Sequence, residues 1–284
     1  MKRFLFLLLC TVLLLCGCTS EVQTPTEKKD ENIVTDEMFT DVDGEYVPVH
    51  NNVDLSSLVP SYFYEDESGR MLYKDESVNI LTGIDVSNHQ NDINWAAVSD
   101  DGIDYVMLRI GYRGWGSKGI MGIDERLEAN YEGAKNAGLA VGGYFYSQAT
   151  TPEEAREEAL FLLDAVKDME FDFPIAYDWE YVDNEENART NGMTGEEITK
   201  CAKAFCEEIE KAGRSVMIYF NCEIGYYEYD LEILKGYDFW LAEYNSYPTF
   251  LYKYTMWQYT KTGRVNGIEG DVDLNISVVD YSDA

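Results

Sequence analysis

The chain has few basic residues and almost no histidine. Of its 284 residues, 22 are Lys or Arg, 53 are Asp or Glu and two are His, which gives a formal net charge of −31. Nucleic-acid-binding proteins neutralise phosphates with Lys and Arg, so this balance predicts no nucleic-acid partner. With only His50 and His89 available and no zinc-ligand spacing, we also expect no metal site and no other cofactor.

Cysteine is scarce as well, and half of the six cysteines lie within the first 18 residues. Cys201, Cys206 and Cys222 remain for the rest of the chain, and three thiols cannot form a complete set of disulfides. We interpret them as small buried residues. Their thiol state does not follow from the sequence.

Apolar runs long enough to span a membrane are missing. The apolar run from Phe4 to Cys16 follows a basic start but is shorter than a spanning helix, so residues 1–17 are predicted to be a signal peptide. The segment "LCGC" resembles a bacterial lipoprotein cleavage box, with Leu15 three residues before Cys18. Cys18 is then expected to carry a lipid that anchors the chain at the extracellular face of the bacterial cell membrane. An ordinary secretion signal, with an incidental cysteine, is the alternative.

The rest of the chain divides into three regions by composition. Residues 18–60 are acidic, polar and without hydrophobic periodicity, which predicts a flexible tether. Residues 61–80 form a short lead-in whose aromatic residues flank an "ESG" turn, as in a small hairpin. Residues 81–284 carry regular apolar runs and are predicted to form one folded domain.

Eight apolar runs of strand length recur in this domain, with helical patterns at 124–138, 151–168 and 194–213. Alternating strands and helices favour a parallel sheet, and eight strands favour closure into a barrel. The connections before the last two strands are too short for crossover helices. We therefore predict an α/β fold, a TIM-like (β/α)5(β)3 barrel, with antiparallel strands allowed among the last three. The runs are "LTGIDVS", "DYVMLRIGY", "LAVGGYFYS", "FPIAYDWEY", "SVMIYFN", "DFWLAEYN", "YTMWQYT" and "GDVDLNIS".

The fourth run is apolar except for Asp178 and Glu180. Residues two apart on a strand point to the same face, with Cα atoms roughly 6.6 Å apart. Unpaired buried charge is costly, so the pair indicates a working site. The spacing alone is weak support, because such pairs arise by chance in a chain with 53 acids. The ends of other strands add Asp85, Glu243 and Asp273 at the rim where barrels of this kind carry their chemistry.

Aromatic residues share this rim, and Arg109 on the second strand is a plausible buried counter-charge. An acid cluster walled by aromatic rings suits stacking on sugars and acid-assisted cleavage of a glycosidic bond. For any one of these aromatics taken singly, core packing is the more common role. The rim aromatics are Tyr144, Tyr146, Tyr219, Tyr244 and Trp257.

Five segments between about Gly83 and Asn275 resemble, in order, those of glycoside hydrolase family 25, whose members are N-acetylmuramidases. The resemblance covers the whole predicted domain and implies a barrel of five βα units and three strands. It also implies action on peptidoglycan glycan strands, at the β-1,4 bond between N-acetylmuramic acid and N-acetylglucosamine. Separately, we expect a monomer, although the sequence itself does not give the oligomeric state. The segments are "GIDVSNHQNDINW", "GLAVGGYFYSQA", "PIAYDWE", "FWLAEYN" and "MWQYTKTGRVNGIEGDVDLN".

By this resemblance, Glu180 is the proton donor and Asp178 orients the substrate's acetamido group. The acetamido oxygen would act as the nucleophile in a retaining, substrate-assisted reaction. Glu180 must hold a proton at working pH, while Asp178 is expected to stay ionised. Asp85 and Asp273 match the family's other active-site acids. If substrate assistance fails, a direct nucleophile, Asp178 or Asp273, has to replace it.

Four further residues are expected to bind substrate. Three match positions that line the sugar cleft in the family, and the fourth, Glu243, occupies a rim position that varies among members. One departure is Asn91, where the family's first motif has glycine, so the shape of that loop is expected to differ. The four expected substrate-binding residues are Tyr144, Tyr219, Glu243 and Gln258.

Two alternatives remain open at this point. A family 18 chitinase shares a barrel and an acidic strand, but it needs an acid where Ala176 stands. A non-catalytic wall-binding surface lipoprotein needs none of the acids, yet burying them without use is costly. The sequence does not distinguish the cell's own wall from a foreign one, and it does not give wall-peptide preference.

Overall fold

The structure is a computed structural model that describes residues 38–40, 46–182 and 185–282, all within the compact unit of residues 33–284. The predicted signal peptide, Cys18 and the first part of the predicted tether lie outside the described residues. Among the residues that are described, no helix is both long enough and apolar enough to cross a bilayer.

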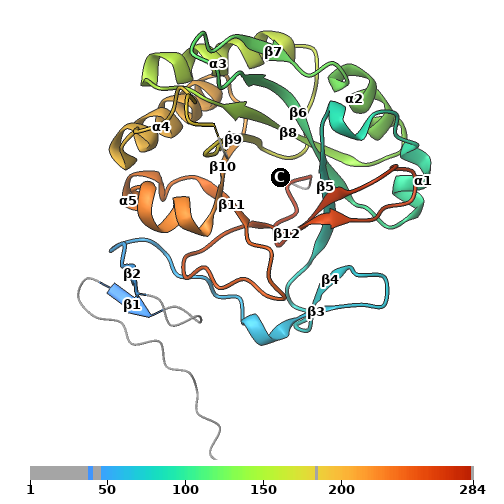
Figure 1. The fold of residues 1–284 in the computed structure, drawn as a ribbon. Helices are drawn as coiled ribbons and strands as arrows, with labels where there is room; N and C mark the ends of the chain where they lie inside the picture. Colours follow the sequence, from blue (N-terminus) through green and yellow to red (C-terminus); the bar gives the residue numbers. More distant parts are fainter. Residues whose placement is uncertain (1–37, 41–45, 183–184, 283–284) are drawn as a thin grey trace, which may run out of the picture. The chain divides into compact units, whose positions relative to one another are not determined.

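Eight strands close into a barrel, and helices cover its outside (Figure 1). The strands pair in the order β5-β13-β12-β11-β10-β9-β8-β6, and pairing of β5 with β6 closes the ring. The predicted α/β, TIM-like barrel is therefore confirmed, and each of the eight apolar runs holds one strand. The barrel strands are β5 Leu81–Val86, β6 Tyr105–Arg113, β8 Ala140–Ser147, β9 Ile175–Trp179, β10 Val216–Asn221, β11 Asp238–Ala242, β12 Met256–Gly263 and β13 Val272–Ser277.

One strand of the ring is inverted. β13 pairs antiparallel with both β12 and β5, while the other neighbours in the ring pair in parallel. Asp273 consequently lies at the start of β13 and not at its carboxyl end, which corrects the expectation from sequence. Because the strand is inverted, its start reaches the rim where the parallel strands end, and Asp273 pairs in register with Asp85.

Among the described residues, five α-helices flank the strands, and the three longest are those predicted from the sequence. Thr151 caps α3 by accepting a hydrogen bond from the Glu154 backbone, and Thr194 forms a capping box with Glu197 at the start of α4. α1 and α5 have six and four residues, too few for a helical period to be recognised. The helices are α1 Trp95–Asp100, α2 Leu127–Asn136, α3 Pro152–Ala165, α4 Gly195–Lys211 and α5 Leu231–Leu234.

Shorter elements surround the barrel strands. β7 pairs with the end of β6 as a hairpin, and β3 pairs with β4 around the "ESG" turn that the sequence suggested as a hairpin. β1 and β2 form a separate antiparallel pair. The bounds are β1 Met38–Thr40, β2 Tyr46–Pro48, β3 Phe63–Glu65, β4 Met71–Tyr73 and β7 Met121–Ile123, with the short helices η1 Pro60–Tyr62, η2 Asn88–Gln90 and η3 Ile224–Glu228.

Residues 46–58 pack against the barrel. Val47 is buried, and the Ser56 N–H donates to the carbonyl of Leu251 at 2.9 Å. The Lys253 N–H donates in turn to the carbonyl of Asp54 at 2.8 Å. This differs from the expectation of a flexible tether up to residue 60, because backbone pairing fixes a stretch whose composition alone suggests a linker.

The barrel interior is apolar toward the amino ends of its strands. Tyr105, the first residue of β6, stacks on Phe173 with ring centroids 4.4 Å apart. Gly83 makes room for this ring, since a Cβ there would lie 2.1 Å from Cζ of Tyr105. The packing fills this end of the barrel and leaves the opposite rim as the place where polar groups gather.

The three cysteines of the domain are free thiols. Cys201 and Cys206 on α4 are buried in the apolar core, which confirms their interpretation as small buried residues. Cys222, directly after β10, is only half-buried.

Candidate active site

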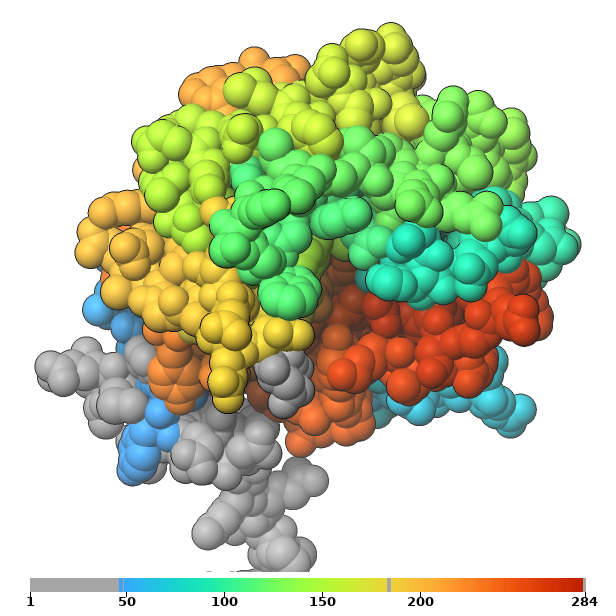
Figure 2. All heavy atoms as spheres, turned by 45° about the horizontal axis from the view of Figure 1, so that its top comes forward, coloured from blue at the N-terminus to red at the C-terminus, as the bar shows by residue number. Residues whose placement is uncertain are grey.

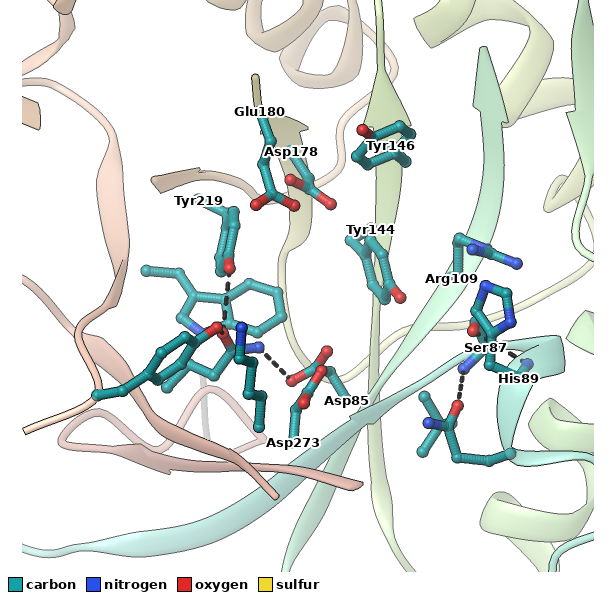
Figure 3. Close-up of a pocket in the computed structure, with 16 residues that line it drawn as sticks. Asp85, Ser87, His89, Arg109, Tyr144, Tyr146, Asp178, Glu180, Tyr219 and Asp273 are labelled. Carbon is teal, nitrogen blue, oxygen red and sulfur yellow. Dashed lines mark hydrogen bonds between the residues drawn. The ribbon is translucent and has the colours of Figure 1, made fainter. Parts of the chain in front are cut away.

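A cavity of about 580 Å³ opens at the rim where the parallel strands end. In the space-filling view, the surface is hollowed between the green segment around β6 and β7 and the red segment of β12 and β13 (Figure 2). Seven of the eight residues predicted for catalysis or substrate binding line this cavity (Figure 3). They are Asp85, Tyr144, Asp178, Glu180, Tyr219, Gln258 and Asp273.

Strand register explains why residues far apart in the sequence meet here. Asp178 on β9 lies in register with Tyr219 on β10, and Asp85 on β5 lies in register with Asp273 on β13. Side chains at paired positions share a face of the sheet, which here is the inner face of the barrel. Two carboxyl pairs, Asp178 with Glu180 and Asp85 with Asp273, therefore face the cavity from opposite sides (Figure 3).

The first carboxyl pair joins Asp178 and Glu180. Asp178 is 5% exposed, and its carboxyl group hydrogen-bonds to that of Glu180. Burial first, and the charge of Glu180 second, raise the pKa of Asp178 well above its usual range. This shift favours the protonated form of Asp178, which runs against the expectation that Asp178 stays ionised. Its Oδ1 is buried and has no hydrogen-bond partner among the described residues.

The second carboxyl pair joins Asp85 and Asp273. Oδ2 of Asp85 accepts hydrogen bonds from Nε2 of Gln258 and Nδ2 of Asn275, each at 2.8 Å. Burial raises the pKa of Asp85 against the opposing effect of these donors. Burial and then the charge of Asp85 raise the pKa of Asp273 to about 8. With a pKa of about 8, Asp273 keeps its proton at neutral pH beside the carboxyl group of Asp85.

A hydrogen-bond chain ties the second pair to the aromatic wall. The hydroxyls of Tyr219 and Tyr244 donate to Oε1 of Gln258 at 3.0 and 2.8 Å. The amide of Gln258 then donates to Asp85 at its other end. Because both ends of this amide are occupied, these hydrogen bonds together fix the orientation of the Asp85 carboxylate and of the two tyrosine rings.

Arg109 is the cation that the sequence suggested as a counter-charge for the acids. Its guanidinium lines the cavity, but its Nε donates to Asp124 at 2.7 Å and it also hydrogen-bonds to Asn88. Asp124 is buried, so it balances most of the arginine charge. Arg109 lowers the pKa of Asp178, but burial of Asp178 has the larger, opposite effect.

Residues 84–268 match the family model described as Glycosyl hydrolases family 25. The chain belongs to this family. The autolytic lysozyme of Clostridium acetobutylicum is 28% identical over 197 residues, which cover 69% of this chain and 55% of that protein. Lysozyme M1 of Streptomyces globisporus is 27% identical over 208 residues, which cover 69% of this chain and 67% of that protein.

A solved structure shares the family 25 fold. The family 25 glycosyl hydrolase from Bacillus anthracis aligns with a TM-score of 0.57 and 22% identity, over 72% of this chain and 90% of that one. The chain spans about half the length of the Clostridium relative and about two thirds of the Streptomyces one.

The family 25 domain holds Glu180 through a contact that the sequence did not reveal. Glu180 directly follows β9, and its carbonyl accepts a hydrogen bond from Nε2 of Gln148 at 2.9 Å. Gln148 is fully buried and accepts at Oε1 from the hydroxyl of Thr190 at 3.0 Å. Gln148 thus fixes the backbone that carries Glu180. Spacing gives no signal for a contact between residues 32 positions apart in separate connections.

Glu243 is the predicted substrate-binding residue that does not line the cavity. Its carboxylate accepts hydrogen bonds from the Thr249 N–H at 2.8 Å, the Thr249 hydroxyl at 2.6 Å and the Asn245 amide at 3.0 Å. The expectation of a substrate contact is corrected, because both oxygens support the loop of residues 245–250. Trp257 is also buried and donates to the Glu243 carbonyl at 2.8 Å, so this predicted rim aromatic belongs to the core.

Other residues line the cavity of this family 25 domain without having been assigned to it from the sequence. Several lie in the turn after β5, whose shape strand periodicity does not describe. Asn275 does not line the cavity but supports it by donating to Asp85, and the alternation of sides along β13 from Asp273 could have revealed it. The unassigned lining residues are Val86, Ser87, His89, Gln90, Trp240 and Lys261.

Metal ligands were not expected at this site. Among the described residues, no group of three or more His, Cys, Asp or Glu side chains is arranged to hold a metal ion. That the reaction needs no cofactor stays a prediction.

Proposed function

We propose that the chain is a peptidoglycan hydrolase, a lysozyme that cleaves the β-1,4 bond between N-acetylmuramic acid and N-acetylglucosamine with retention of configuration. The observation that carries this proposal is the placement of two carboxyl pairs across one cavity of about 580 Å³. Acid-assisted cleavage of a glycosidic bond needs acids with different proton affinities beside the bond. Two curated relatives are named lysozymes, which supports the same substrate.

Glu180 acts as the general acid. In the first step the proton of its carboxyl group passes to the glycosidic oxygen as the bond breaks. The hydrogen bond from Gln148 to the Glu180 carbonyl keeps the acid at a fixed place on the cavity wall.

Asp178 positions the acetamido group of the substrate. A buried acceptor without a donor costs about 1–3 kcal/mol, and the substrate's acetamido N–H is a suitable donor for Oδ1 of Asp178. The acetamido carbonyl oxygen, held in this way, attacks the anomeric carbon and forms a ring intermediate. Water then opens the ring while the Glu180 carboxylate takes its proton, so the product keeps the β configuration.

The remaining cavity groups bind the sugar and stabilise its charge. With one proton between them, Asp85 and Asp273 keep one negative charge, which stabilises the positive charge that develops on the ring. Tyr144 and Tyr219 offer aromatic faces on the cavity wall for sugar contacts.

The test is the release of labelled fragments from purified peptidoglycan sacculi. The wild type should release label, and Glu180→Gln should release it on the order of 10²-fold more slowly while still sedimenting with the sacculi. Wild-type protein that binds sacculi and releases nothing would contradict the proposal and favour a non-catalytic wall-binding protein.

We also propose that a lipid on Cys18 holds the chain at the extracellular face of the cell membrane, where this substrate lies. The lipobox-like "LCGC" segment after a short apolar run supports this location.

A further inference from the structure

Two strong cations line the otherwise acidic cavity, Arg109 and Lys261. Arg109 is balanced by the buried carboxylate of Asp124. Lys261, in contrast, takes part in no ion pair with any residue that the structure describes, although the chain has more than twice as many acids as bases. An uncompensated ammonium group therefore faces the space that substrate must enter.

Lys261 is exposed on β12 and is held near an ordered ring. Its Nζ lies 5.4 Å from the centroid of the Tyr244 ring, a cation–π contact worth about 0.5–1 kcal/mol at an exposed site. The Tyr244 hydroxyl is fixed by its hydrogen bond to Gln258. The ammonium is thus oriented at the cavity wall.

A simpler role for Lys261 is to stabilise the carboxylate of Asp273. Burial and the charge of Asp85 raise the pKa of Asp273, and Lys261 acts in the opposite direction. If this were its role, replacing Lys261 would change the activity on every substrate alike and would shift the pH profile of the activity. This role leaves the ammonium without a direct partner among the described residues.

The chemistry of the substrate supplies a partner of the right charge. Muramic acid carries a lactyl carboxylate, which is free on denuded glycan strands and amide-linked where a stem peptide is attached; the peptide has carboxylates of its own. The two carboxyl pairs give the cavity a negative potential that repels such groups unless a cation meets them.

We propose that Lys261 forms a carboxylate-binding subsite at the cavity wall, which pairs with the lactyl or stem-peptide carboxylate and favours acidic glycan strands over neutral ones. This inference rests on the proposed function, since it names the substrate group that the same cavity selects. Lys261 acts as a specificity residue and takes no part in bond cleavage.

Three substrates distinguish the sources of the carboxylate. Amidase-denuded glycan strands offer only lactyl carboxylates, peptide-bearing strands offer only stem carboxylates, and denuded strands reduced at the carboxyl group to the alcohol offer neither. The full-length chain in detergent is compared with Lys261→Met, Lys261→Arg and the control Lys203→Met, an exposed lysine on α4. The rate at which new reducing ends form gives kcat and KM for each combination of protein and substrate.

Lys261→Met should raise KM about 3- to 10-fold on the strands that carry the partner carboxylate, with little change in kcat, and Lys261→Arg should restore most of the affinity. On carboxyl-reduced strands the difference between Lys261→Met and wild type should disappear. Lys203→Met should match wild type throughout. The strand type that shows the effect identifies lactyl or stem carboxylate as the partner.

The contrary result is that Lys261→Met weakens activity equally on charged and carboxyl-reduced strands and shifts the pH profile of kcat. That result would overturn the proposed subsite and show that Lys261 acts by stabilising the carboxylate of Asp273. Unchanged KM on both charged substrates would overturn it as well. Wild-type protein that cleaves no strand at all would instead contradict the proposed function, so the two failures are distinguishable.

Discussion

Each acid at the barrel rim takes its properties from its immediate partners. Asp85 accepts hydrogen bonds from two amides. Burial and then the charge of a neighbouring acid raise the pKa of Asp178 and the pKa of Asp273. The four side chains are chemically alike, yet their surroundings give them different proton affinities. Burying Asp85 and Asp178 costs stability, which a functional site tolerates.

The role of Asp178 can be tested by replacing its carboxylate with an amide. Asp178→Asn should lower kcat by about 10- to 100-fold, because the acetamido group is no longer held for attack. Wild-type enzyme should be similarly slow on glycan strands from which the muramic N-acetyl groups have been removed. Should native and de-N-acetylated strands be cut equally fast, substrate assistance fails and a direct nucleophile, Asp178 or Asp273, has to replace it.

Asp273 should make the folded protein less stable as pH rises. Its pKa is about 8 in the folded state, raised by burial and then by Asp85 from the ordinary value of 3.8. The folded state therefore keeps a proton that the unfolded chain loses, so this contribution to the free energy of unfolding is full below about pH 4 and is lost as pH rises to about 8. Asp273→Asn should raise the free energy of unfolding at pH 8 by on the order of 1–3 kcal/mol.

Urea denaturation of wild type and Asp273→Asn at pH 5 and pH 8 measures this effect. Asp271→Asn is the matched control, because Asp271 is exposed two residues away and its replacement removes the same charge. Parallel pH dependence in all three proteins would show that Asp273 does not hold the proton.

At the residue scale, seven of the eight residues predicted from the sequence for catalysis or substrate binding line the cavity. Position at a strand end and alternation of sides determine which side chains reach the rim, and both can be read from the sequence. The sequence does not show that Glu243 turns away from the cavity, because its hydrogen-bond partners lie in a loop. It also does not show that Gln148 supports Glu180, because this contact joins two connections between strands and helices. Neither kind of contact leaves a periodic pattern.

At the element scale, the site depends on strands held in fixed register. The parallel strands deliver their acids at their carboxyl ends, and the inverted β13 delivers Asp273 at its start. The apolar runs predicted all eight barrel strands, and the helical patterns predicted α2, α3 and α4. The direction of β13 was not predictable, because parallel and antiparallel strands have the same two-residue alternation.

Close packing between β5 and β6 should tolerate no added methyl group. Gly83→Ala would place Cβ 2.1 Å from Cζ of Tyr105, whose ring is held against Phe173. We expect a loss of about 1–3 kcal/mol or more in the free energy of unfolding. Gly236→Ala is the control, since a Cβ there meets no heavy atom within 4 Å. Equal denaturation midpoints for the two variants would contradict this account of the packing.

At the scale of the whole molecule, the net charge of −31 and the N-terminal segment bear on where the protein acts. Cys18 lies outside the described residues, so the lipid anchor stays a prediction from the sequence. Cys18→Ala should move the protein from the membrane fraction into the medium or leave it unprocessed, as fractionation and immunoblotting would show. Cys10→Ala, inside the apolar run, should behave as wild type, and unchanged attachment of Cys18→Ala would exclude lipidation there.

The central claim is that the barrel rim cleaves peptidoglycan after N-acetylmuramic acid. Purified peptidoglycan is digested with the full-length protein, the fragments are reduced with borohydride, and mass spectrometry identifies the sugar at each new reducing end. The account predicts reduced N-acetylmuramic acid, formed on the order of 10²-fold more slowly in digests with Glu180→Gln. Reduced N-acetylglucosamine at the new ends would contradict the account, because it would mean that the enzyme cuts the other glycosidic bond of the strand.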